Sequence, residues 1–200
     1  MSSIEQLHNN LKDEREKLTK DFLSKSLSRD KVIRGGVASN TVRAMHYGKC
    51  YFKYSPISIY RNWMDTTLLS DDGMLKDIHE ESDFKALHDT AIDSLKSFWF
   101  SKEPEVKGKM PHYFFPKMID LTFKMMVNWD ELQEDRSIWF WRNAHVPIDK
   151  YSLICLSKYH PDYNIKSPSM NYIGNDKDLY DEIQAEIRAL MKPYPPLLFD

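Results

Sequence analysis

The chain has 200 residues, of which 42% are hydrophobic and 29% charged, and its formal net charge at pH 7 is −2. This length suits a single domain, and this composition excludes collagen-like, low-complexity and mostly disordered chains. No apolar run reaches the roughly 18–20 residues that cross a bilayer, and the charged start lacks the apolar core of a secretory signal. We therefore predict one cytoplasmic domain, residues 1–200, with no membrane partner.

The cysteines and histidines give no metal motif. The two cysteines, Cys50 and Cys155, lack metal-site spacing, which excludes four-cysteine iron–sulfur and zinc sites. Two free thiols also suit a reducing compartment. The seven histidines never pair at metal-ligand spacing. The sequence thus predicts no cofactor and no metal, and a metal site assembled from distant residues has no support in it.

Charge is distributed unevenly along the chain. Residues 1–61 hold 12 Lys and Arg against 6 Asp and Glu, whereas residues 62–95 hold 2 against 9. A basic face would attract phosphate backbones even though the total charge is near zero. Two ordinary solvated faces explain the same counts, and charge alone favours this second interpretation.

The first half of the chain reads as helical. Apolar residues recur at helical spacing over residues 4–27, 57–69 and 83–100, which predicts three helices. Gly35 and Gly36 interrupt the pattern after residue 30, and residues 42–60 fit helix, strand or irregular structure equally well. Residues 101–116 contain three prolines and two Lys-rich turns, which indicates a loop.

The second half, residues 101–200, continues this pattern. Pro116 suits the first turn of a helix that runs to about Trp129, because its missing N–H is not needed there. A connection over 130–149 holds one short helical piece, SIWFWRN. Asp149 is a preferred N-cap for a helix over 150–159, and a last helix over about 176–191 follows. Strand signals are sparse, so we predict an all-α fold.

Two residues at predicted helix starts are candidates for catalysis. Lys117 follows Pro116 in the first turn, where the helix dipole and burial disfavour the ammonium and favour the nucleophilic amine. Asp149 is expected to accept backbone N–H bonds, which keep it ionised. Such a carboxylate can deprotonate a nucleophile or stabilise a sugar cation. A surface lysine and a plain N-cap are the alternative interpretation.

The segments FFPKMIDLTFKMM and HVPIDKYSLICL, which place Lys117 and Asp149 32 residues apart, resemble the catalytic segment of the helix-hairpin-helix DNA glycosylase superfamily. The long gap is similar to that of the archaeal 8-oxoguanine DNA glycosylase branch. The resemblance covers about residues 107–160. It implies that Lys117 is the Schiff-base lysine and Asp149 the aspartate of the motif, in an enzyme that extrudes one nucleotide from duplex DNA and excises its base.

The hairpin before the lysine departs from the family pattern. Where the family has L-P-G-V-G, this chain has MPHYFFP, and its nearest glycine is Gly108. Lys107 and Lys109, on either side of that glycine, are expected to supply the phosphate contact electrostatically. The hairpin is therefore predicted to be atypical.

The resemblance also implies DNA contacts around the pair. We predict that aromatic side chains line a base pocket or wedge the gap in the duplex, with core packing as the alternative, and that Arg142 contacts phosphate. The predicted residues are Phe114, Phe115, Trp139, Phe140, Trp141 and His145. The partner is DNA and the enzyme a monomer, with or without AP-lyase activity. An oxidised purine follows from the branch, and a hypermodified cytosine of phage DNA, in a defence role, is an equal alternative.

Two rival functions stay open. A non-catalytic helical module would bind nucleic acid or an acidic partner through Lys31, Arg34 and Lys49, with strong salt dependence and no product. A protein-interaction adaptor would use the acidic segment 65–93 instead.

Overall fold

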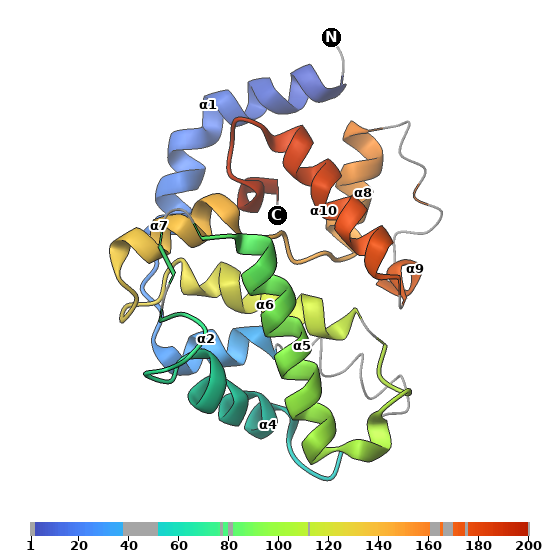
Figure 1. The fold of residues 1–200 in the computed structure, drawn as a ribbon. Helices are drawn as coiled ribbons and strands as arrows, with labels where there is room; N and C mark the ends of the chain where they lie inside the picture. The colour runs from blue at the N-terminus through green and yellow to red at the C-terminus, as the bar shows by residue number, and fades with distance from the viewer. Residues whose placement is uncertain are drawn as a thin grey trace.

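The protein has an all-α fold, as the sequence predicts (Figure 1). The computed structural model describes residues 3–37, 52–76, 78–79, 82–111, 113–160, 165, 170–174 and 176–199. Within them no strand occurs, and one isolated bridge joins Leu27 to Trp129. Of the stretch 42–60, whose structure the sequence leaves undecided, residues 42–51 lie outside the described residues. They include Lys49 and Cys50.

Most of the chain between these gaps is helical. The helices predicted over 83–100, 150–159 and 176–191 are confirmed to within two residues at each end. The elements are α1 (Ser3–Leu23), α2 (Arg29–Gly36), α4 (Pro56–Trp63), the π-helical turn Met64–Leu68, α5 (Phe84–Lys102), the 3-10 turn Pro104–Val106, α6 (Phe114–Met126), α7 (Glu134–Asn143), α8 (Lys150–Tyr159), α9 (Met170–Ile173), α10 (Lys177–Met191) and the 3-10 turn Pro196–Phe199.

Helix α6 runs through the middle of the molecule, with α5 crossing it and α2 and α7 packed along it (Figure 1). Met118, Ile119, Phe123 and Met126 are fully buried. Such a helix is apolar on more than one face, because neighbouring helices surround it. The predicted catalytic lysine, Lys117, is therefore carried by a rigid element of the core.

Gly35 and Gly36, which interrupt the apolar pattern in the sequence, are the last two residues of α2. A Cβ atom on Gly36 would lie 2.7 Å from Tyr60 Oη and would also collide with Thr122 of α6. Only glycine lets the backbone of α2 approach α6 this closely. The tertiary packing thus outweighs the low helix propensity of glycine, which the sequence alone does not reveal.

Helix α6 ends at Met126, three residues before the predicted end near Trp129, and α7 begins at Glu134, three residues before the predicted piece SIWFWRN. Two other helix ends differ from the prediction for identifiable reasons. Helix α1 ends at Leu23, four residues before the predicted end, because Leu27 leaves the helical path and pairs with the turn at residues 128–130. The Leu27 N–H donates to the Asn128 carbonyl over 2.8 Å, and the Leu27 carbonyl accepts from Asp130 N–H over 3.1 Å. Helix α6 begins two residues before Pro116, which still lies among the first residues, whose N–H groups have no helical partner.

Among the described residues, every helix is too short or too polar to cross a bilayer.

Candidate active site

The chain between α5 and α6, residues 103–113, forms a hairpin with an exposed tip. Val106 and Met110 are buried and anchor it. Between them Gly108 adopts a φ of 83°, in the left-handed region that favours glycine, and a Cβ there would meet no atom within 4 Å. Lys107 and Lys109 flank this glycine and are exposed. The order of elements is therefore α5, a connection that contains Gly108, and α6.

Lys117 occupies the start of α6. Its N–H donates the first backbone bond of regular α-helical spacing, to the Tyr113 carbonyl over 3.2 Å. The side chain is half-buried, and burial lowers the pKa of the ammonium, an effect that the carboxylates of Asp149 and Asp120 oppose. In the described part of the chain, no carboxylate lies within 4.0 Å of its Nζ. The amine is therefore biased toward its neutral form and is not consumed by a direct ion pair.

Asp149 caps α8, as the sequence predicts. Its Oδ1 accepts from Tyr151 N–H at 2.7 Å and from Ser152 N–H at 3.0 Å, and the Ser152 hydroxyl accepts from Asp149 N–H at 2.7 Å. This reciprocal capping box fixes the carboxyl at the positive end of the helix dipole. The bonds described for the side chain all use Oδ1, so Oδ2 is available to act on a neighbour.

The fold brings the carboxylate of Asp149 into electrostatic range of two lysines on α6. The negative charge of Asp149 partly offsets the lowering of the Lys117 pKa by burial. It has the same effect on the pKa of Lys124, two turns further along the helix. Burial lowers the pKa of Lys124, and the ammonium of Lys25 lowers it further. The sequence analysis singled out only Lys117. The seven-residue spacing of the two lysines, which puts them on one face of a helix, is the signal that identifies the second.

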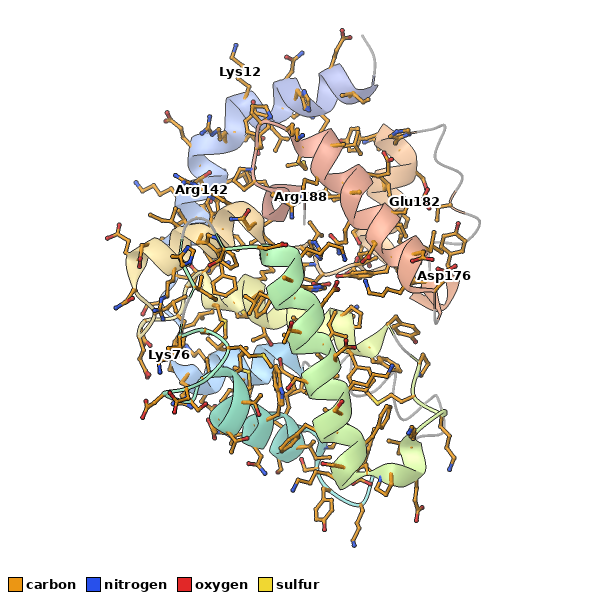
Figure 2. All side chains as sticks on the ribbon, in the orientation of Figure 1. Lys12, Lys76, Arg142, Asp176, Glu182 and Arg188 are labelled. Atoms are coloured by element: carbon orange, nitrogen blue, oxygen red, sulfur yellow. The ribbon has the colours of Figure 1, made fainter. Side chains whose placement is uncertain are left out.

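Helix α10 holds the segment that leads to Asp149. The Gln184 amide forms two hydrogen bonds with the backbone of Val146: Nε2 donates to its carbonyl over 2.8 Å, and Oε1 accepts from its N–H over 3.2 Å. Arg188, which points toward the end of α7 in Figure 2, donates from Nη2 to the Asn143 carbonyl over 2.7 Å. The orientation of residues 144–149 is thus set by a helix that follows them in the chain.

A buried polar cluster lies beside the lysine. It consists of His88, Asp120, His145 and Tyr180, and we call it the buried cluster. Asp120 Oδ1 is 2.9 Å from His88 Nε2, and Asp120 Oδ2 accepts from the Tyr180 hydroxyl over 2.7 Å. Tyr180 Oη is also 3.4 Å from His145 Nδ1. Asp120 is one turn along α6 from Lys117, so the two groups share a helix face.

Burial controls the ionisation of the buried cluster. It raises the pKa of Asp120 and of Tyr180, and it lowers the pKa of His145. The sequence analysis assigned His145 to DNA contact and gave no role to the other three. Their positions in the sequence show no motif, because each comes from a different element of the fold.

The predicted aromatic contacts are core residues. Phe115 is 0% exposed and packs against Trp99 and Phe100 with ring centroids 6.3 and 5.6 Å apart, which is the core packing given above as the alternative to a DNA contact. Phe114 and Phe140 are buried in the same way. These three rings belong to the apolar core between the packed helices, as the alternative interpretation of the sequence proposes.

Helix α7 borders two surface hollows. Trp139 and Arg142 line one of about 550 Å³, and Trp141 and Arg142 line another of about 430 Å³. Arg142 is exposed and lies beside α1 in Figure 2. Neither hollow is lined by Lys117 or Asp149. The residues predicted to form one site thus fall into two regions, the lysine–aspartate pair and the α7 surface.

Comparison with known proteins adds no relative: no family model, curated protein or solved structure matches this chain.

Proposed function

We propose that this protein is a DNA glycosylase in which Lys117 and Asp149 act together on the sugar of an extruded nucleotide. The observation that carries the proposal is their juxtaposition: two residues 32 positions apart, at the starts of α6 and α8, lie within electrostatic range of each other. A half-buried amine with a lowered pKa, within electrostatic range of a carboxylate fixed by a helix cap, suits nucleophilic attack on carbon. The helix–hairpin–helix order around Lys117 supports the same class.

The reaction uses the two side chains in distinct roles. Asp149 takes a proton from the Lys117 ammonium and passes it to the departing base, so that the restored carboxylate stabilises the positive charge that develops on the deoxyribose. The Lys117 nitrogen forms a bond to C1′ while the C1′–base bond breaks, and the base leaves with that electron pair and is protonated. Opening of the sugar ring then gives an imine, from which β-elimination cleaves the strand. A monofunctional enzyme would use water in place of the lysine and release an abasic site.

Binding of duplex DNA is assigned to the exposed cations. Lys107 and Lys109 project from the hairpin tip, where the left-handed Gly108 keeps the backbone close to the surface. Arg142 adds a cation on α7. We assign the protein to the cytoplasm, acting as a monomer. Oxidised purines and hypermodified cytosines of phage DNA are the two substrate classes, corresponding to repair and to defence.

The test is trapping with borohydride, which reduces the imine to a stable amine. Duplex oligonucleotides that carry 8-oxoguanine, glucosylated hydroxymethylcytosine or an abasic site are incubated with the protein and the reductant. We expect a covalent adduct on at least one of them, and we expect Lys117→Gln to abolish it. Lys124→Gln is the matched control, because Lys124 lies on the same helix, is also half-buried and also senses Asp149.

The outcomes separate the alternatives. If the adduct still forms in Lys117→Gln, or is lost only in Lys124→Gln, then Lys117 is not the nucleophile. If neither adduct nor base release appears on the panel while salt-sensitive DNA binding is retained, the non-catalytic module is the better description.

A further inference from the structure

We propose that the buried cluster binds one divalent transition-metal ion of the zinc class, through His88, Asp120 and His145 with Tyr180 as the fourth donor. This inference concerns the metal-binding capacity of the chain and does not depend on the glycosylase proposal.

The donor atoms have the spacing of a coordination sphere. Ligand atoms of His88, Asp120 and His145 all lie within 4.8 Å of one another. Tyr180 Oη completes the set, 2.7 Å from Asp120 Oδ2, 3.4 Å from His145 Nδ1 and 3.5 Å from His88 Nε2. Tetrahedral zinc with bonds of about 2.0–2.1 Å places neighbouring donors about 3.3 Å apart. Small side-chain adjustments therefore suffice to admit an ion.

A bound cation would also balance the charge of the buried Asp120 carboxylate. Asp120 is 0% exposed, and its described hydrogen-bond partners are a histidine and a tyrosine, with no lysine or arginine ion pair among them. A buried carboxylate is stable only when it is paired, protonated or bound to a metal. Metal ions bind neutral imidazole, which His88 and His145 can both supply.

The surroundings resemble the outer shell of a metal site. Metal-binding histidines usually donate from the second ring nitrogen to a carboxylate or carbonyl. His88 Nδ1 is buried and has no hydrogen-bond partner, and the nearest carboxylate oxygen, Asp89 Oδ1, is 3.9 Å away. Asp89 is thus the carboxylate that lies near this nitrogen, beyond hydrogen-bond distance in this structure. Gln184 Nε2, 3.2 Å from Tyr180 Oη, orients the fourth donor.

The arrangement specifies a structural ion. Four protein donors fill a tetrahedral sphere and leave no position for substrate. The donors come from α5, α6, α10 and the segment before Asp149, so an ion would join four parts of the chain that are far apart in sequence. It would thereby brace α6 and the 144–149 segment against α10.

The experiment measures metal directly on the full chain. The protein is purified without chelator, its metal content is determined by mass spectrometry, and the stripped protein is titrated with Zn²⁺ and with Co²⁺, whose visible bands report four-coordinate geometry. We expect one ion per chain. His145→Gln and Asp120→Asn should weaken binding by more than about 100-fold, beyond the ~10–100-fold typical of outer-shell partners. His79→Gln, at an exposed histidine outside the cluster, should bind as wild type.

Each result decides the proposal. A folded chain, verified by circular dichroism, that neither retains metal nor gives Co²⁺ bands would overturn it and leave a hydrogen-bonded polar core. Wild-type affinity in either cluster variant would also overturn it. Should a variant fail to fold, the Co²⁺ spectrum of the wild-type chain alone answers the question.

Discussion

The Lys117–Asp149 pair and the buried cluster meet on one turn of α6, yet they differ in how far their polar groups are satisfied. Lys117 is half-buried and has no carboxylate in direct contact in the described structure, and Asp149 uses one oxygen for its cap. Asp120 is fully buried and both its oxygens are bonded. A group whose bonds are complete stabilises the fold, whereas a group with spare capacity is available to a substrate. Substitutions in the two regions should therefore separate activity from stability.

The largest effect is expected at Asp149. Asp149→Asn should slow base excision by about 10²–10⁴-fold, because the variant cannot accept a proton or offset charge on the sugar. Asparagine caps a helix as well as aspartate, so the free energy of unfolding should change by less than about 1 kcal/mol. Single-turnover excision and urea denaturation measure the two quantities.

Asp176→Asn is the matched control for this substitution. Asp176 caps α10 through Leu179 N–H over 2.9 Å, so the same chemical change is made at a cap outside the pair. It should leave the excision rate unchanged. A comparable rate loss in both variants would mean that Asp149 acts only through helix capping.

The opposite behaviour is expected at Asp120. Asp120→Ala removes the acceptor of two buried groups, His88 Nε2 and the Tyr180 hydroxyl, and should lower the free energy of unfolding by about 2–5 kcal/mol. Urea denaturation in the presence of a chelator measures the hydrogen bonds alone. Asp93→Ala, at an exposed site on α5, should stay within about 0.5 kcal/mol of wild type. Equal stability of the two variants would contradict a structural role for Asp120.

Gln184 links the two regions and should show an intermediate effect. Gln184→Leu leaves the buried N–H and carbonyl of Val146 without their partner and should cost about 1–3 kcal/mol of stability. Excision should also slow, because the segment before Asp149 loses its anchor. Glu182→Leu, an exposed polar-to-leucine change on the same helix (Figure 2), is the control. If both variants unfold alike, the anchoring role is wrong.

The smallest effect concerns pH. Burial holds the pKa of Lys117 in the folded protein below its ordinary value of 10.5. At pH values between the folded-state and the unfolded-state pKa, the unfolded chain binds more protons, so the free energy of unfolding rises with pH. Lys117→Met removes this contribution. The variant should be more stable than wild type at pH 7, and the gain should shrink as pH rises toward 10.5. Paired urea denaturation curves measure the difference, and a gain independent of pH would refute burial as the cause.

Local patterns in the sequence identified the parts of the site that depend on near neighbours. The cap at Asp149 involves residues 149–152, and the apolar spacing that defines α5, α8 and α10 repeats within each helix. The position of Lys117 near the start of α6 followed from Pro116. These features are predictable because their hydrogen bonds and periodicity span only a few residues.

Other features depend on contacts between distant segments and had no local signal. The close packing at Gly36 needs α6, the anchor of Val146 needs Gln184, and the buried cluster joins residues up to 92 positions apart. The Phe115 ring shows the same limit, since a core aromatic and a DNA-contacting one look alike in sequence. Only the packing of the helices distinguishes them.

The sequence by itself determined an all-α chain and placed a lysine and an aspartate at the starts of two helices, because helix periodicity and capping are encoded locally. The tertiary structure alone decided that Lys117 and Asp149 lie within electrostatic range of each other, that Asp120 is buried one helical turn from Lys117, and that α10 holds the segment that leads to Asp149. Those outcomes depend on which apolar faces pack together, and that is settled by burial over the whole chain.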